Sequence, residues 1–373
     1  MRLFSIRFIF LIIPLIMILI IILYVNSHQN IKIGFISDFA NDGSEMSIYS
    51  RNAAIIGIED LNKKGGVHNR KFELIVRNIT DNNNELAGII EELVKNNVKI
   101  IIGPSVSRQA SATLKAIKDR EIIVISPTIS SIESSNIDDN FFKLNTSARD
   151  EGTELALKAI ENGNKSFALI WSYYNNLYTG AVIDGARETL IQKGYSILID
   201  LEFTNNEDSI EIANLIKLYS VDGVIFAGKG DHIGQITQQI SRLGINCNLY
   251  ANQWSKSTDL LEHAGRSAEG MIIADVFSYK NPDYLEFSRK FYSSYKTDPV
   301  PSAVLTYDTL NVIFKIYENI EGRVTASKIK KFLLEDFSFE GLSGNFRFNK
   351  YGDAQRDELM FSTVVAGEYI SYE

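Results

Sequence analysis

Short apolar runs alternate with helical periods along the chain from Ile31 onward. Four of these runs have the length and the β-branched composition of buried strands, and they are Ile31–Ile36, Phe72–Val76, Val98–Ile102 and Ile122–Ile125. Between the second and third runs, apolar residues recur every three or four positions and predict a helix; they are Leu86, Ile89, Ile90, Leu93 and Val94. Strands that alternate with helices are typical of a mostly parallel sheet with helices on both faces, which is an α/β fold.

The same alternation starts again after a strand predicted at Phe141–Leu144. A helical period at 155–160 precedes four more predicted strands, which are Phe167–Ile170, Tyr195–Phe203, Val221–Ala227 and Met271–Val276. One α/β unit needs roughly 100 to 150 residues, and the 373 residues of this chain contain more strands than one sheet holds comfortably. The pattern therefore predicts two Rossmann-like lobes, each built on a parallel sheet.

The last third of the chain has a different order of elements. Helices are predicted at Val304–Tyr317 and Ser327–Leu334, and strands follow at Asn345–Phe348 and Leu359–Ala366. This order indicates that the chain crosses between the lobes again near its end.

The chain begins with an apolar run that does not fit either lobe. Phe8–Val25 has 18 residues, and no charged residue lies between Arg7 and Lys32. As a helix it is about 27 Å long, close to the thickness of the hydrocarbon core of a bilayer. The run predicts a transmembrane anchor, with Arg2 and Arg7 on the cytoplasmic side and the lobes outside the cytoplasm. A cleaved signal that leaves a secreted or periplasmic protein is the alternative, although no A-x-A-like cleavage site follows the run.

Charge and cysteine content restrict the classes of binding partner and of covalent attachment that the chain can have. The chain has 38 basic and 46 acidic residues, and without Arg2 and Arg7 the remaining 36 basic residues leave a net charge of −10. The basic residues are scattered, which argues against a nucleic-acid partner and leaves small molecules or proteins. Cys247 is the single cysteine, so no intramolecular disulfide and no lipid attachment near the N-terminus is expected.

Motifs for catalysis or cofactors are weak. Gly228–Gly234 follows a predicted strand as a dinucleotide fingerprint does, but its third glycine is one position late, which favours a glycine turn at the edge of a cleft. Gly341–Asn345 lacks the last glycine of a nucleophile elbow and precedes a strand, so a turn is expected there. The four histidines are far apart and form no zinc motif. The motifs therefore give no evidence for an enzyme, although they leave one open, and no cofactor or metal is expected. The family resemblance described below favours binding without catalysis.

Two hydroxyl-rich loops follow neighbouring strands of the first unit. Gly103–Ala112 comes after the strand that ends at Ile102, and Ser126–Ser131 comes after the next strand. Ligands of α/β sheets bind at the carboxyl ends of strands. Ser105 or Ser107 can either cap the following helix or donate a hydrogen bond to a ligand carboxylate. A polar pocket is expected at this edge of the sheet.

The ordered set of motifs resembles a known family. Ile31–Phe39, Gly57–Val67, Ile102–Pro104, Ile125–Pro127 and Ala268–Met271 are similar, in order and spacing, to the leucine/isoleucine/valine-binding type of periplasmic binding protein. These proteins are the extracytoplasmic solute receptors of ABC transporters. The resemblance covers the whole chain after the apolar run.

The resemblance implies two lobes that close on a ligand about a hinge of three crossover strands. It places residues 31–146 and 278–344 in lobe one, and residues 147–277 and 345–373 in lobe two, after an N-terminal segment of residues 1–30. The expected partners are a small polar ligand, the permease subunits of an ABC transporter and the membrane. A ligand-sensing subunit for a signalling partner is the alternative function.

The resemblance also assigns ligand contacts to both lobes. In lobe one, Ser107, with Ser105 beside it, and the Ile129 backbone with the Ser130 hydroxyl are expected to hold the ligand's carboxylate and ammonium. Substitution of Ser107 or Ser130 by Ala is expected to weaken binding. In lobe two, Tyr178 matches an aromatic of the family pattern, while Tyr173 and Tyr174 compete for that place.

Four further positions of the family pattern bear on the ligand. Gln253, next to Trp254, stands where an acid usually pairs with the ligand's ammonium, and Lys229 stands where an aromatic is common. A neutral amide cannot supply that charge, so either Asp231 does or the ligand is not an ordinary α-amino acid. Trp254 either stacks on the ligand or packs within lobe two. Ala148 replaces an acid that is common after the first crossover, and Asp308 is expected to cap a helix or contact the ligand. Amides, urea-like solutes and carboxylates are therefore ligand candidates beside amino acids.

Overall fold

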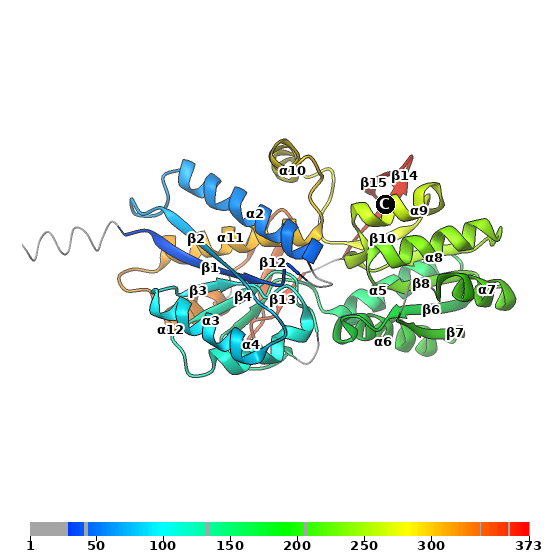
Figure 1. Ribbon diagram of the computed structural model, residues 1–373, viewed down its shortest axis with the longest axis horizontal. Helices are drawn as coiled ribbons and strands as arrows, with labels where there is room; N and C mark the ends of the chain where they lie inside the picture. Colours follow the sequence, from blue (N-terminus) through cyan, green and yellow to red (C-terminus); the bar gives the residue numbers. More distant parts are fainter. Residues whose placement is uncertain are drawn as a thin grey trace, which may run out of the picture.

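The computed structural model describes residues 29–40, 44–131, 134–204, 208–335, 337–356 and 359–372. Within these ranges, no helix is both long enough and apolar enough to cross a bilayer. The anchor predicted at Phe8–Val25 lies outside the described residues. The described part of the chain forms two α/β lobes side by side (Figure 1).

The first lobe contains a five-stranded parallel sheet in the order β2-β1-β3-β4-β5. Its strands are β1 (Ile31–Ser37), β2 (Phe72–Asn78), β3 (Ile100–Ile102), β4 (Ile123–Ser126) and β5 (Phe141–Lys143). Its helices are α2 (Ser44–Lys63), α3 (Asn83–Lys95), α4 (Ala110–Ile117), α10 (Pro282–Tyr295), α11 (Pro301–Asn319) and α12 (Ala326–Leu334), with the short turn η1 (Ser107–Gln109) before α4. Helices α2 and α11 pack on one face of the sheet, and α3 and α4 pack on the other. All five strands predicted for this lobe are confirmed.

The second lobe contains a seven-stranded sheet in the order β15-β14-β10-β9-β8-β6-β7. Its strands are β6 (Ser166–Ser172), β7 (Ser196–Phe203), β8 (Gly223–Ala227), β9 (Asn248–Ala251), β10 (Ile272–Asp275), β14 (Met360–Val365) and β15 (Glu368–Ser371). Its helices are α5 (Ala148–Glu161), α6 (Asn176–Gln192), α7 (Ser209–Tyr219), α8 (Gly230–Arg242) and α9 (Thr258–Ala264). The strands β14 and β15 are antiparallel, so this sheet is mixed and not wholly parallel.

Three crossovers join the lobes, and the third comes later in the chain than the sequence predicts. The strands β11 (Phe339–Gly341), β12 (Gly344–Phe348) and β13 (Ala354–Gln355) form a small antiparallel sheet. Phe346 and Phe348 of β12 are buried in the apolar core of the first lobe, where Phe348 meets Phe142 edge to face. Residues 345–355 therefore belong with the first lobe, although the sequence placed them in the second, and the last crossing lies between β13 and β14. Two-residue periodicity marked β12 as a strand but could not show which core it joins.

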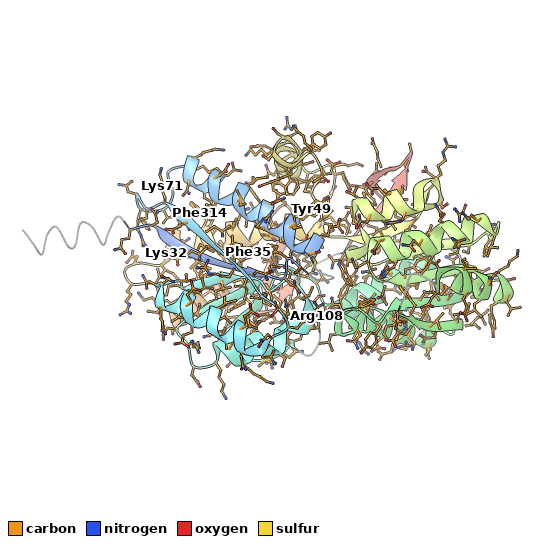
Figure 2. The ribbon with its side chains drawn as sticks, viewed as in Figure 1. Lys32, Phe35, Tyr49, Lys71, Arg108 and Phe314 are labelled. Atoms are coloured by element: carbon orange, nitrogen blue, oxygen red, sulfur yellow. The ribbon has the colours of Figure 1, made fainter. Side chains whose placement is uncertain are left out.

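One end of the first lobe faces the second lobe, and the other end points away from it. Figure 2 shows Lys32 and Lys71 at the outer end and Tyr49 and Arg108 at the end that faces the second lobe, with Phe35 in the interior. Phe35 is fully buried between the sheet and α2. Parallel strands place their carboxyl ends at one edge, so the loops after β3 and β4 open toward the other lobe.

The single cysteine lies in the second lobe. Cys247 is partly buried and packs against the apolar cluster under α7 and α8. Burial raises the pKa of its thiol to about 11.

Candidate ligand-binding site

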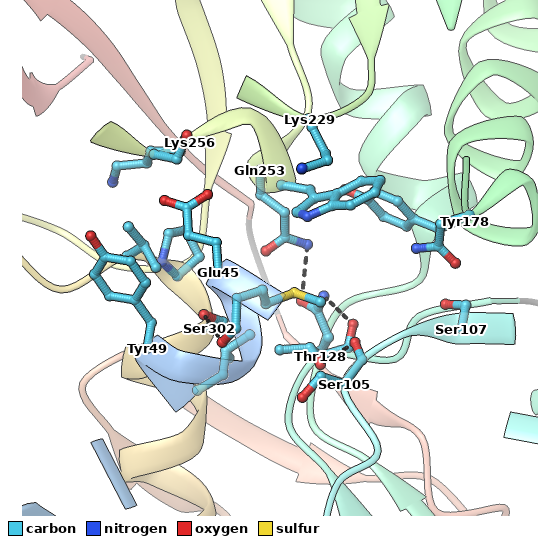
Figure 3. Close-up of a pocket in the computed structure, with 18 residues that line it drawn as sticks. Glu45, Tyr49, Ser105, Ser107, Thr128, Tyr178, Lys229, Gln253, Lys256 and Ser302 are labelled. Carbon is cyan, nitrogen blue, oxygen red and sulfur yellow. Dashed lines mark hydrogen bonds between the residues drawn. The ribbon is translucent and has the colours of Figure 1, made fainter. Parts of the chain in front are cut away.

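A cleft lies between the lobes, and side chains from both of them line it (Figure 3). The first lobe contributes the start of α2, the loops after β3 and β4, and the start of α11. The second lobe contributes the start of α6, the residue before α8, and η4 (Gln253–Ser255) with the residues after it. The cleft is therefore at the carboxyl edge of both sheets. The two hydroxyl-rich loops predict a polar pocket at this edge of the first sheet.

Six of the eight site residues suggested by the sequence line this cleft. They are Ser105, Ser107, Tyr178, Lys229, Gln253 and Trp254. Ile129 is fully buried, and its N–H already donates to the Ser126 hydroxyl at 3.0 Å. Ser130 lines a separate hollow behind the crossovers, beside Lys143. The structure thus places neither Ile129 nor Ser130 at the cleft, because the chain turns inward after Thr128, which does line it.

Hydrogen bonds hold the serine loop of the first lobe in place. The Ser105 hydroxyl lies 2.6 Å from that of Ser37, which donates to Ser47 at 2.7 Å. The Thr128 hydroxyl donates to the Ser105 carbonyl at 2.7 Å and ties the two loops together. Ser107 begins η1 and lines the cleft. Ser105 therefore shapes the loop, and Ser107 is the hydroxyl better placed for a ligand.

Tyr178 is the tyrosine of the 173–178 segment that reaches the cleft. Tyr173 is exposed, and neither it nor Tyr174 lines the cleft. The Tyr178 hydroxyl lies 2.9 and 3.1 Å from the two carboxylate oxygens of Glu151. Its ring meets the Trp254 ring edge to face, with 6.1 Å between their centres. The sequence left the choice among the three tyrosines open, and Tyr178 is the one that lines the cleft.

Glu151 is a buried acid that the sequence reading missed. It lies on α5 one turn after Ala148, and it is fully buried behind Gln253. Its carboxylate accepts hydrogen bonds from the Gln253 backbone N–H at 2.7 Å and from the Gln253 side chain at 3.2 Å. Burial raises the pKa of Glu151 to about 7 despite these donors. Its helical spacing from Ala148 and Leu155, on the buried face, was the available signal.

The charged side chains of the cleft come from opposite lobes. Lys229 precedes α8 in the second lobe and lies 3.6 Å from Asp231, which the sequence offered as a substitute acid. Asp231 is thus engaged with Lys229 and does not line the cleft. Glu45, at the start of α2, does line it, and the sequence gave no sign of its role. Burial and then Asp259 of the second lobe raise the pKa of Glu45 to about 7.

Glu45→Gln is expected to change how stability depends on pH. Because the pKa of Glu45 is about 7 when folded and 4.5 ordinarily, the folded state keeps its proton between these values while the unfolded chain loses it. The free energy of unfolding therefore falls as pH rises through this window. The variant lacks this dependence, so urea titrations should show its stability gaining on the wild type from pH 4.5 to 7. A constant difference over that range would contradict the assignment.

Lys256 forms a buried ion pair at the back of the cleft. Its ammonium contacts the carboxylate of Asp275 at the end of β10. The ammonium also lies 4.0 Å from the ring centre of Phe277 and 4.7 Å from that of Tyr279. Both charged groups are fully buried, which lowers the pKa of Lys256 and raises the pKa of Asp275. This pair anchors the second crossover beside the cleft.

Two motifs singled out in the sequence serve the fold. Gly230 opens α8, where a Cβ would lie 2.3 Å from the Ser257 hydroxyl, so this glycine turn permits close packing beside the cleft. Gly341–Gly344 is the turn between β11 and β12. Asp308 is interior to α11 and neither caps that helix nor lines the cleft. Its carboxylate accepts the N–H groups of Leu342 and Ser343 in that turn.

The described residues contain no cluster of histidine, cysteine or acidic groups that could hold a metal.

The family now follows from comparison with known proteins. A family model described as periplasmic binding protein matches residues 30–368. The chain belongs to the periplasmic binding protein family. Members are solute-binding proteins and not enzymes, so this periplasmic binding protein acts by binding.

Curated relatives of this periplasmic binding protein bind branched-chain amino acids. The leucine-, isoleucine-, valine-, threonine-, and alanine-binding protein of Pseudomonas aeruginosa is 20% identical over 333 residues, which are 88% of this chain and 88% of that protein. The Leu/Ile/Val-binding protein of Escherichia coli (strain K12) is 19% identical over 338 residues, which are 89% and 90% of the two chains.

Solved structures show the same fold with different ligands. The branched-chain amino acid transporter substrate binding protein LivJ of Streptococcus pneumoniae, in complex with isoleucine, has a TM-score of 0.82 and 17% identity, and the match covers 92% of this chain and 99% of that one. A solute binding protein of an ABC transporter from Rhodopseudomonas palustris, in complex with 3,4-dihydroxy benzoic acid, has a TM-score of 0.81 and 18% identity and covers 92% and 96%. The fold of this periplasmic binding protein therefore does not define its ligand.

Proposed function

We propose that this protein traps a small polar ligand, an amino acid or a related amide or carboxylate, between its lobes and delivers it to the permease of an ABC transporter. The observation that carries the proposal is the cleft, where hydroxyl and amide groups of both lobes meet an apolar wall. That wall includes Met46, Val300, Pro301 and Leu305. Polar groups opposite an apolar wall suit a ligand with a polar head and a small apolar body.

Contacts across the cleft support a closing motion. The Tyr49 hydroxyl of α2 lies 3.4 Å from the Thr258 hydroxyl of α9. The Gln253 side chain of the second lobe donates to Asn145 of the first crossover at 3.1 Å. A ligand that touches both lobes favours the closed form, because its contacts are complete only there. Closure would then present a distinct surface to the transporter.

We also propose that residues 1–30 place the lobes outside the cytoplasm. Phe8–Val25 is apolar over 18 residues and follows Arg2 and Arg7. An uncleaved helix would hold the protein at the membrane beside its permease, and cleavage would instead release it as a periplasmic or secreted protein.

A thermal-shift screen tests the binding function. A ligand that binds only the folded state is expected to raise the melting temperature of the purified protein. The screen covers amino acids, amides, urea-like compounds and small carboxylates. For a compound that binds, Ser107→Ala is expected to weaken affinity about tenfold or more, since a hydrogen bond to a charged group contributes about 1.5–3 kcal/mol.

Ser130→Ala is the matched control. Ser130 lies outside the cleft, so this variant is expected to bind as the wild type does, in contrast to the expectation from sequence. Equal affinity of the Ser107 variant and the wild type would contradict the placement of the ligand. The absence of a shift with every compound would contradict the proposed ligand class.

A further inference from the structure

The end of the first lobe that points away from the second lobe is built from the loops at the amino edge of the sheet. The helices α2, α3 and α4 each run from the cleft edge back to this end, so the loops that lead into β2, β3 and β4 lie here. Helix α11 also starts at the cleft and ends here. We call this surface the outer face. It consists of the start of β1 and the loops before β2, β3, β4 and α12, which are residues 29–32, 64–71, 96–99, 118–122 and 320–325.

The outer face is basic in a protein that is acidic. It contains eight basic and three acidic residues, whereas the rest of the chain after residue 28 has 28 basic and 43 acidic residues. The basic residues are scattered along the sequence, and the fold brings these eight to one end. Figure 2 shows two of them, Lys32 and Lys71, at this end of the lobe. The protein therefore has a net charge of +5 on the outer face and −15 on the remainder.

Four lysines of the outer face are not neutralised by neighbouring acids. Within the part of the chain that the structure describes, Lys64, Lys71, Lys99 and Lys118 form no ion pair. Lys99 is partly buried, and the other three are exposed. Their ammonium groups are therefore available to an anionic partner.

Two acids lie at the same edge of the sheet, just outside the outer face. Asp138 pairs with Lys330 of α12 at 2.7 Å. Asp139 is half-buried, and its carboxylate accepts the Phe141 N–H at 2.7 Å. With Asp138, Asp139 and Lys330 included, this edge still has a net charge of +4.

The N-terminal segment enters the first lobe at the outer face. Figure 1 shows β1 beginning at this end of the molecule. The apolar run that we propose for the membrane ends at Val25, so five residues separate it from Ile31 of β1. A fully extended chain of this length spans about 20 Å. An uncleaved anchor therefore keeps the outer face near the bilayer surface.

We infer that the outer face is a docking surface for a membrane that contains anionic phospholipid. This inference goes beyond the proposed function and rests on its placement of residues 1–30 for the approach to the bilayer. Basic groups attract anionic headgroups, and salt limits the attraction to about 10 Å at 0.1 M. The basic outer face therefore interacts with the lipid more strongly than the acidic second lobe, which lies farther away. Lipid contact at this end leaves the cleft, at the opposite edge of the sheet, open to solvent.

Lysine footprinting of the full chain in lipid nanodiscs tests the docking surface. An amine-reactive acetyl ester modifies exposed lysines, and mass spectrometry gives the rate at each one. In discs with phosphatidylglycerol at low salt, Lys64 and Lys71 are expected to react about fivefold more slowly than in discs of phosphatidylcholine alone. Lys193 and Lys217, exposed on the second lobe, are expected to react equally in both. Equal rates at Lys64 and Lys71 in the two kinds of disc would overturn the inference.

Charge reversal separates the outer face from the net charge of the protein. Lys71→Glu/Lys118→Glu is expected to make Lys64 react equally in the two kinds of disc. Lys193→Glu/Lys217→Glu changes the net charge by the same amount on the second lobe and is expected to leave the slow reaction of Lys64 intact. If both variants lose it, net charge alone explains the effect and the inference is overturned.

Salt separates the docking surface from the proposed anchor. An inserted helix keeps the chain in the discs at about 0.5 M salt, whereas this salt screens the contact of the outer face. If the chain leaves the discs at high salt but shows the slow reaction at low salt, the anchor is contradicted and the docking surface is supported. If the chain stays in the discs and Lys64 reacts equally in both kinds, the docking surface is contradicted and the anchor is supported.

Discussion

Replacing Lys256 by Met is expected to lower the free energy of unfolding by about 3–5 kcal/mol, the usual cost of leaving one member of a buried ion pair without its partner. Lys256 and Asp275 are 3% and 0% exposed, so water cannot compensate for the lost ammonium. Among the described residues, the Asp275 carboxylate would keep the Val276 N–H as its hydrogen-bond donor. Urea unfolding of the protein without ligand, at neutral pH, measures the change.

The double variant Lys256→Met/Asp275→Leu is the control. Replacement of a buried ion pair by apolar residues of similar volume is often neutral or stabilising. The double variant is therefore expected to recover most of the stability that the single variant loses. If the free energy of unfolding of Lys256→Met stays within 1 kcal/mol of the wild-type value, the ion pair does not stabilise the second crossover.

Gly185→Ala is expected to destabilise the second lobe by about 3 kcal/mol or more, at the upper end of the range for overpacking. A Cβ at Gly185 of α6 would lie 2.0 Å from the carbonyl oxygen of Arg149 on α5. Backbone cannot yield as a flexible side chain does, so α5 and α6 would have to separate. Thermal unfolding measures the loss, and ligand affinity should fall with it because α5 carries Glu151 and α6 carries Tyr178.

Gly180→Ala on the same helix is the matched control. Its Cβ would meet the Trp171 ring at an ordinary 3.6 Å. Alanine favours helix over glycine by about 1 kcal/mol, so this variant is expected to be as stable as the wild type or slightly more stable. Equal losses in Gly180→Ala and Gly185→Ala would show that the close approach of α5 and α6 is not the cause.

Apolar patterning predicted most of the fold because strands buried on both faces are continuous apolar runs. Thus β1 to β8 and β10 were predicted from such runs or from alternation. In contrast, β9 has the sequence Asn-Leu-Tyr-Ala and is only four residues long, so no pattern marks it. The antiparallel arrangement of β14 and β15 depends on pairing across the sheet, which a single sequence does not encode locally.

Site residues were predicted correctly where their position depends on the strand or helix next to them in sequence. They were missed where their position depends on how the two lobes pack together. Ser105 and Ser107 follow a strand and precede a helix, so their place at the sheet edge was predictable. Glu45 reaches the cleft only because α2 and α9 face each other across it, a relation that no spacing reveals. Ser130 lies two residues beyond Thr128, and that distance was enough for the chain to turn away from the cleft.

The burial of Cys247 makes the protein suitable for selective fluorescent labelling at an introduced cysteine. A thiol with a pKa of about 11 is almost wholly protonated at neutral pH, and the thiolate is the form that reacts with maleimides. No other cysteine is present in the chain. A cysteine introduced at Glu262, exposed on α9, could therefore be labelled selectively, and its dye would report the movement of the second lobe against the first.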